Sequence, residues 1–404
     1  MSDKTVNFQI KTKDLSELES ILSSKNFRSL NIQQKLDFFR EIDPQSSKPW
    51  FLSFVAQSPE HIRMLLSHDS VITGGHNFCF ELVTIQDKNK LGILEIATKK
   101  PSTESLKEIL SSKIFKEILS PNELYKTLIQ DNISGISNFA LVTARSPEHL
   151  QIILESNLLD KISESQALIL LNLPISEDES INSIWFSVLK GKEYWYPLFN
   201  SNIINKLNDS EVSSLLTAKY ENNNDETPLE YMVSHYSENE LTLFLGSRIF
   251  KKLNLEVYQQ YTLKNGNDLT VLDIALTKSP ASFKALLECD KCFNILTEDQ
   301  RLEILTSPDI SSLPLVYKAM VIGDNYENII LNSEALLDMS PKHRYDLLDV
   351  ALHSNINVID QETPDPEIVQ VPERLAALVN STLFKSLDHD KQLALLGQQA
   401  EVDE

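Results

Sequence analysis

The residues best spaced for chemistry are two cysteines, Cys289 and Cys292, which form a Cys-x-x-Cys pair. Such a pair can act as a redox couple or supply half of a zinc site. A structural zinc site needs two further ligands, and no second Cys-x-x-Cys or pair of histidines lies near it in the sequence. We therefore expect both cysteines to be structural, and we predict no bound metal.

His76 and Cys79 form a second candidate, because a neighbouring histidine can activate a cysteine as a nucleophile. They follow Gly74 and Gly75, which predict a tight connection. Phe80, the next residue, falls at a position expected to face the core, with Cys79 beside it on a helix. We predict no catalysis by this pair, and a cysteine-based activity remains the enzyme alternative.

The other histidines are scattered along the chain. His61 and His149 each follow a Ser-Pro-Glu sequence at equivalent positions, and because other copies of that position are polar we expect both side chains to be solvated. The chain has no His-Glu-x-x-His, no Walker A loop, no Gly-x-Gly-x-x-Gly and no Gly-x-Ser-x-Gly motif. We predict that the protein is not an enzyme and binds no cofactor.

The net charge of the chain limits the kinds of molecule that it is expected to bind. Its 404 residues carry a formal charge of −21, from 37 Lys and Arg against 58 Asp and Glu. This charge disfavours nucleic acid and anionic membranes and would steer a basic protein toward the surface. Three cysteines suit a reducing compartment, no apolar run approaches the ~20 residues of a membrane span, and the N-terminus lacks a signal-peptide core. We expect no membrane insertion and a cytoplasmic location, or secretion into a host cell without a conventional signal peptide.

These candidate residues belong to a chain that repeats itself about every 44 residues. Leu106–Phe115 nearly duplicates Leu18–Phe27, which lies 88 residues earlier, and Ile62–His68 is a copy halfway between them. An apolar anchor residue marks each of nine copies, at spacings of 42 to 48 residues, and the residue two places later is serine in seven copies. The anchors are Leu22, Leu66, Leu110, Leu154, Phe199, Leu245, Leu287, Leu331 and Val379.

A second column, about nine residues after each anchor, contains only Ser, Thr, Asn or Asp. Its members are Asn31, Thr73, Ser120, Ser163, Asn208, Asn254, Thr297, Ser340 and Asp388. Such side chains accept hydrogen bonds from the first turn of a helix, and four copies carry Glu or Gln three residues later, as a capping box does. Each copy is therefore expected to hold three helices, named here A, B and C. The anchor lies on helix B, and helix C follows the cap column.

No single copy can bury its apolar side alone, so the copies must stack. The sequence predicts an all-α fold, an α-solenoid of about nine three-helix repeats of ~44 residues, as one array over residues 1–404. Residues 1–46 are expected to be an N-terminal capping half repeat, and residues 373–404 a C-terminal cap with an acidic tail. An insertion at 354–372, which contains Pro364 and Pro366, either lies on a binding face, as insertions in repeat arrays often do, or is a passive loop.

Helix A of two copies resembles the ankyrin repeat. Thr227-Pro228-Leu229 and Thr270-Val271-Leu272 are similar to its Thr-Pro-Leu-His signature, and Phe283–Leu287 is similar to its second helix. The ankyrin period is 33 residues, so about 11 further residues per copy would form helix C. The histidine of the signature and the usual glycine between the helices are missing. The resemblance implies an ankyrin-like array that binds proteins.

The repeat style, the composition rich in Asn, Lys and Ile and the acidic C-terminus also resemble effector proteins of intracellular bacteria such as Legionella. This second resemblance implies that the chain is translocated into a host cell and acts in virulence.

The strongest functional signal lies in helix B of the fifth copy, where Tyr194, Trp195 and Tyr196 are adjacent. Trp195 occupies the core position of helix B, but Tyr194 and Tyr196 fall where other copies are mostly polar. Exposed aromatic residues often dominate the energy of protein interfaces. We take these three residues and Trp185 as candidates for protein binding. The alternative is that the cluster only repacks around Pro197 and Trp185.

The sequence therefore predicts a non-enzymatic scaffold for protein–protein interaction, in its most specific form an effector that binds a host protein. A basic protein is the expected partner. Two alternatives stay open, an intracellular regulatory inhibitor or chaperone, and an enzyme that uses a Cys/His pair on the array.

Overall fold

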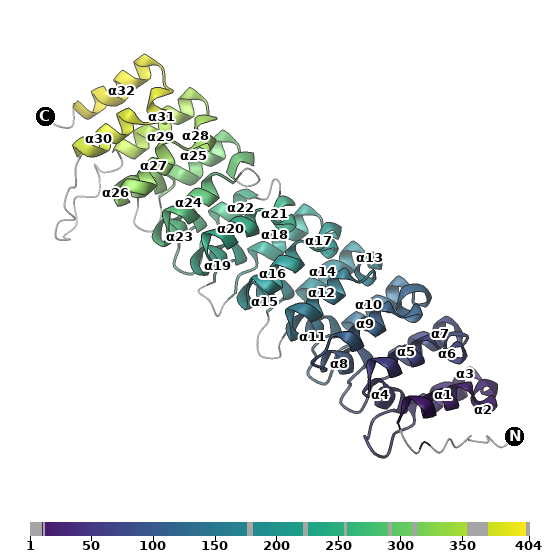
Figure 1. Cartoon of the computed structure of the whole chain (residues 1–404). Helices are drawn as coiled ribbons and strands as arrows, with labels where there is room; N and C mark the ends of the chain where they lie inside the picture. The colour runs from purple at the N-terminus through teal and green to yellow at the C-terminus, as the bar shows by residue number, and fades with distance from the viewer. Residues whose placement is uncertain are drawn as a thin grey trace. The chain divides into compact units, whose positions relative to one another are not determined.

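The structure of this chain is a computed structural model that describes residues 10, 13–175, 181–220, 225–253, 257–289, 293–308, 313–353 and 371–400. Helices make up 71% of the described residues, and apart from four isolated β-bridges in loops these residues hold no strand (Figure 1). The predicted all-α fold is thus confirmed. The chain divides into two compact units, Met1–Leu207 (unit 1) and Asn208–Glu404 (unit 2).

Unit 1 holds seventeen described α-helices and one short π-helix, η1. They are α1 (Leu15–Ser23), α2 (Lys25–Ser29), α3 (Ile32–Arg40), α4 (Trp50–Val55), α5 (Pro59–Ser67), α6 (Asp69–Ile72), α7 (Gly75–Val83), α8 (Ile93–Thr98), α9 (Glu104–Ser111), η1 (Ile114–Ile118), α10 (Pro121–Ile129), α11 (Asn138–Arg145), α12 (Pro147–Glu155), α13 (Leu158–Lys161), α14 (Glu164–Asn172), α15 (Ser183–Lys190), α16 (Lys192–Phe199) and α17 (Asn202–Lys206).

Unit 2 continues the same order of long and short helices within its described residues. They are α18 (Asp209–Thr217), α19 (Pro228–His235), α20 (Glu238–Leu245), α21 (Arg248–Lys251), α22 (Val257–Thr262), α23 (Val271–Lys278), α24 (Pro280–Leu287), the 3-10 helix η4 (Phe293–Ile295), α25 (Glu298–Thr306), α26 (Leu315–Ile322), α27 (Asp324–Leu331), α28 (Glu334–Leu337), α29 (Pro341–His353), α30 (Val371–Asn380), α31 (Thr382–Lys385) and α32 (His389–Ala400).

The serine column explains a helix that the sequence analysis missed. A short helix of three to five residues separates helix B from helix C in each copy, so the expected three helices are four. Ser24 shows why serine suits this position, because its hydroxyl donates to the carbonyl of Ile21 at 2.8 Å and accepts from the N–H of Phe27 at 3.1 Å. One side chain therefore ends helix B and starts the next helix. Ser381 makes the same pair of bonds with Leu378 and Phe384.

The cap column before helix C is largely confirmed. The side chains that accept a backbone N–H there are Asn31, Ser120, Ser163, Asn208, Thr297, Ser340 and Asp388. All four predicted capping boxes form, and Asn31 with Gln34 adds a fifth. Thr73 is a wrong prediction, since Gly74 stands at the N-cap of α7 and Gly75 adopts a positive φ of 80°. Asn254 lies outside the described residues.

Equivalent helices of successive copies pack on one another inside each unit. In unit 1 the A helices α4, α8, α11 and α15 pack in succession, and so do the B helices α1, α5, α9, α12 and α16. In unit 2 the A helices α19, α23 and α26, the B helices α20, α24, α27 and α30, and the C helices α18, α22, α25, α29 and α32 do the same. Eight of the nine anchors are buried, and at the ninth Val379 is half-buried while its neighbour Leu378 is buried.

Hydrogen bonds with the spacing of the repeat also tie the copies together. Lys100 donates its Nζ to the carbonyl of Ala56 at 2.5 Å, 44 residues away, and Lys278 donates to the carbonyl of Ser234 at 2.8 Å over the same separation. Further lysine-to-carbonyl bonds join Lys206 to Asp160, Lys161 to Lys116 and Lys219 to Lys264. Because carbonyls in the last turn of a helix and in loops lack helical partners, these ammonium groups satisfy them across the boundary between copies.

Candidate functional site

The structure describes only one member of the Cys-x-x-Cys pair. Cys289 is half-buried, and Cys292, like Pro364 and Pro366 in the insertion, lies outside the described residues. The described part of the chain contains no group of three His, Cys, Asp or Glu side chains that could hold a metal ion.

Cys79 and His76 lie in different environments on α7, because Cys79 is buried and His76 is exposed. Burial raises the pKa of the Cys79 thiol to about 11, so the thiolate needed for attack is scarce near neutral pH. The Nε2 of His76 pairs with Glu123 at 2.7 Å. Our assignment of Phe80 to the core was wrong. Phe78 and Cys79 are buried and Phe80 is half-buried, because α7 begins one residue later than Thr73 would have placed it.

His61 and His149 are buried, which contradicts the expectation that they are solvated. Their exposed fractions are 8% and 2%. Each stands at the third position of helix B, where its Nδ1 contacts the N-cap hydroxyl of Ser58 at 3.0 Å or Ser146 at 2.8 Å. The imidazole thus takes the place of the Glu in a capping box, and it folds back onto the helix end rather than into solvent. Burial lowers the pKa of His149, and the charge of Arg145 adds to that effect.

The aromatic cluster is divided by burial. Trp195 is fully buried, as its core position predicted, and Trp185 is 3% exposed. Tyr194 is half-buried with its ring edge-on to Phe186 at 5.7 Å. Tyr196 is 44% exposed. Any contact that this cluster makes with another molecule therefore falls mainly to Tyr196, whose ring lies edge-on to that of the buried Trp195.

Tyr196 belongs to a surface that we call the B-helix surface, made by the outer sides of α5, α9, α12 and α16 in unit 1. The equivalent residues on the other three helices are also exposed, namely Arg63, Lys107 and Gln151. A groove of about 270 Å³ runs between α9 and α12 on this surface, with Leu110 and Ile152 among its walls. Arg63 binds Glu108 of the next copy through two nitrogens, which fixes α5 against α9. The column that contains Tyr196 is therefore polar or charged on the other three helices of this surface, and Tyr196 is its aromatic member.

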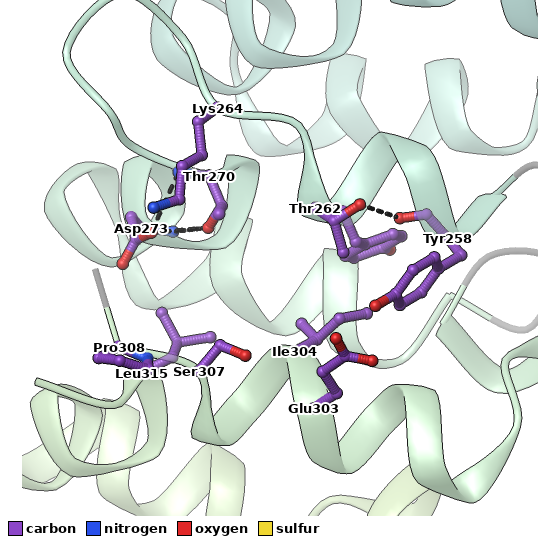
Figure 2. Close-up of a pocket in the computed structure, with 11 residues that line it drawn as sticks. Tyr258, Thr262, Lys264, Thr270, Asp273, Glu303, Ile304, Ser307, Pro308 and Leu315 are labelled. Atoms are coloured by element: carbon purple, nitrogen blue, oxygen red, sulfur yellow. Dashed lines mark hydrogen bonds between the residues drawn. The ribbon is translucent and has the colours of Figure 1, made fainter. Parts of the chain in front are cut away.

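A pocket of about 370 Å³ lies in unit 2, among α22, the loop that follows it, the start of α23, the end of α25 and the start of α26 (Figure 2). Its walls are Tyr258, Tyr261, Thr262, Lys264, Thr270, Asp273, Glu303, Ile304, Ser307, Pro308 and Leu315. A pocket of this size accommodates one large side chain or a small molecule.

Local sequence shapes the upper side of the pocket. The Oδ1 of Asn265 accepts the backbone N–H groups of Asn267 at 2.9 Å and Leu269 at 3.1 Å, which curls the loop. Asp268 adopts a positive φ of 60°, a conformation that Asp tolerates better than most residues. The loop then delivers Thr270 to the N-cap of α23, where Thr270 and Asp273 form a capping box.

Some charged side chains around the pocket have an oppositely charged partner, and Glu303 has none among the described residues. Asp273 pairs with Lys318 at 2.6 Å and also accepts the N–H and hydroxyl of Thr270, and Lys264 pairs with Asp268 at 3.3 Å. Glu303 is exposed, and no cation in the described residues pairs with it. Burial raises the pKa of Tyr258, and the hydrogen bond to Glu303 and the negative charge of Glu303 raise it further, to about 12. The phenol of Tyr258 therefore stays neutral. The pocket therefore presents, beside an aromatic ring, a carboxylate whose charge is not balanced by a cation among the described residues.

The sequence analysis missed this pocket. Tyr258 and Glu303 are 45 residues apart, so the repeat places them in neighbouring copies, and that spacing was the signal that could have found them. The charge of the chain is also unevenly divided between the two units. Unit 1 has 22 Lys and Arg against 25 Asp and Glu, whereas unit 2 has 15 against 33. Unit 2 thus carries −18 of the net −21.

These features describe an all-helical protein. Its first unit has a polar surface that bears the exposed Tyr196, and its second, acidic unit contains a pocket. Comparison of the chain with models of known protein families, with curated proteins and with solved structures found no match. None of the helices in the described residues is both long enough and apolar enough to span a bilayer.

Proposed function

We propose that this chain is a non-enzymatic protein-interaction scaffold, that each unit is a stretch of an α-solenoid with ankyrin-like repeats of ~44 residues, and that the B-helix surface of unit 1 binds another protein. The exposed ring of Tyr196 carries the proposal. It is an aromatic residue with 44% of its surface in solvent, in a column whose other exposed members on this surface are polar or charged.

The physical basis is the energy of aromatic contacts. Tyrosine buries a large apolar area at low entropic cost and adds a hydroxyl that can hydrogen-bond at the rim of an interface. The ring of Trp195 packs at 5.8 Å from that of Tyr196, and Trp195 itself is fixed in the core against Phe199. Tyr196 is therefore held in place before a partner arrives, which lowers the entropy cost of binding.

The repeat supports the solenoid part of the proposal. The stacking of A on A, B on B and C on C, and the lysine-to-carbonyl bonds at the repeat spacing, are the nearest-neighbour contacts that a solenoid uses. The net charge of the whole chain, of which unit 2 carries −18 of −21, favours a basic protein as partner. In the most specific form of the proposal the chain is an effector and the partner is a host protein.

The test compares the full-length chain with its Tyr196→Ala variant. Proteins retained from host and bacterial lysates by the immobilised chain are identified, and the affinity of the enriched protein is measured in solution. We expect Tyr196→Ala to weaken binding by about 2 kcal/mol or more, roughly 30-fold in Kd.

Thr242→Ala is the matched control. Thr242 occupies the same column on α20 of unit 2, is exposed, and differs from alanine by little, so it should leave the affinity within about twofold. Equal affinity of the wild type and the Tyr196→Ala variant, with circular dichroism unchanged, would remove the B-helix surface as the interface.

A further inference from the structure

We propose that the pocket of unit 2 is a receptor for an arginine side chain of a protein partner, with Glu303 as the carboxylate that binds the guanidinium and Tyr258 as the ring on which it stacks. This inference rests on the proposed function, because it assumes a protein partner, and it adds the chemistry by which that partner is recognised.

The walls of the pocket match the two parts of an arginine side chain. Tyr258 and Glu303 stand together at one side, with the phenol oxygen near the carboxylate, and Ile304 and Leu315 line the lower side (Figure 2). Ile304 and Leu315 are buried, at 8% and 3% exposed, so they present a firm apolar surface to an aliphatic stem. Lys and Arg bury such stems along apolar surfaces while the charged group meets polar ones.

The charges favour a cation over an anion. Both Asp273 and Lys264 are engaged, by Lys318 and Asp268, so their charges largely cancel within the pocket wall. Glu303 is left with a hydrogen bond from Tyr258 and no cation among the described residues. The surrounding unit carries 33 acidic against 15 basic residues, which attracts basic surfaces and repels phosphates and carboxylates.

Arginine fits better than lysine. A guanidinium is planar and can stack on the ring of Tyr258 while it donates two parallel hydrogen bonds to a carboxylate. The hydroxyl of Ser307 lies at the exposed rim of the same pocket and can accept a further bond. An ammonium group is a compact, strongly hydrated charge and uses neither the ring nor the fork of the carboxylate as fully.

The test titrates the full-length protein with the peptide Ac-Ala-Arg-Ala-NH2 by isothermal calorimetry. A peptide with citrulline in place of arginine is the ligand control, because citrulline keeps the shape and loses the charge. We expect weak but saturable binding of the arginine peptide, and at least about tenfold weaker binding of the citrulline and lysine peptides.

Glu303→Gln is the decisive variant, since glutamine keeps an oxygen that accepts from Tyr258 and removes the charge. We expect about a tenfold loss of affinity for the arginine peptide. Glu238→Gln makes the same change in net charge at an exposed site on α20 outside the pocket lining and should change the affinity less than twofold. The melting temperatures of both variants establish that the fold is intact.

Four outcomes overturn the inference. They are no detectable arginine-peptide binding at millimolar concentration, equal losses in Glu303→Gln and Glu238→Gln, tighter binding of free L-arginine than of the peptide, and inorganic phosphate binding that depends on Lys264. A failure here is separable from a failure of the proposed function, because Tyr196→Ala should leave peptide binding unchanged. A partner that still depends on Tyr196 while the peptide does not bind removes only the pocket.

Discussion

Replacing Glu230 by Gln should stabilise this protein at neutral and alkaline pH. Glu230 lies on α19 and is 1% exposed. Its Oε2 accepts the backbone N–H of Thr227 at 2.6 Å, while Oε1 is buried with no hydrogen-bond partner in the described residues. Burial raises the pKa of Glu230 to about 7, against the hydrogen bonds from Thr227 and the charge of Lys219, which lower it, and Glu226 raises it further.

The direction in which stability changes with pH follows from proton binding. In the unfolded chain the carboxyl group titrates near 4.5, and in the folded chain near 7, so between these values the folded state binds more protons. Stability therefore falls as pH rises through this window, and the full loss is present above pH 7. At 1.36 kcal/mol per pKa unit the loss is about 3 kcal/mol. Gln keeps the acceptor for Thr227 and carries no charge, so the variant should gain up to about 3 kcal/mol at pH 8 and nothing at pH 4.

Urea unfolding followed by circular dichroism at pH 4, 6 and 8 measures this difference. Asp273→Asn is the matched control, because Asp273 occupies the same helical position 43 residues later and pairs with Lys318 at 2.6 Å, with both side chains largely buried. Breaking that pair should instead destabilise by about 1–3 kcal/mol at pH 7. A Glu230→Gln variant as unstable as Asp273→Asn at pH 8, or a gain of stability that does not change with pH, would refute the reasoning.

Two further predictions concern unit 1. Trp195→Ala should destabilise the protein by roughly 3–5 kcal/mol in urea unfolding, because it removes a fully buried ring. Tyr196→Ala should cost less than about 1 kcal/mol, because that side chain is 44% exposed. Similar costs for the two variants would contradict the burial pattern. Asp43 is fully buried, and burial by itself raises its pKa. Hydrogen bonds from Lys13, Ser46, the Gln45 backbone and Ser53 outweigh that effect and lower the pKa to about 2. The ionised carboxylate therefore stabilises the fold fully above pH 4, and this stabilisation is lost as pH falls through about 2. Asp43→Asn should therefore cost about 2 kcal/mol at pH 7 and little at pH 2, and a cost that is the same at both pH values would show that the charge of Asp43 is not responsible.

The helical architecture of each copy could be predicted from the sequence because its signals are local. A cap residue and the Glu or Gln three places later bond within one turn, so Ser120 with Glu123 and Asn208 with Glu211 form their boxes irrespective of the rest of the chain. The anchors repeat at the same interval as the buried positions, which is why eight of nine were assigned correctly. The short helix after each anchor was missed because one serine both ends helix B and starts the next helix.

Only the tertiary structure decided which polar residues are buried and where the pocket lies. His61 and His149 stand in a polar column, yet the packing at the start of helix B covers them, and no sequence period distinguishes a polar residue in solvent from one folded onto a helix end. Tyr258 and Glu303 meet only when neighbouring copies stack. Burial and electrostatic contact depend on which side chains of the neighbouring copy lie close in space. Packing sets the distances between those side chains, and spacing along the chain does not.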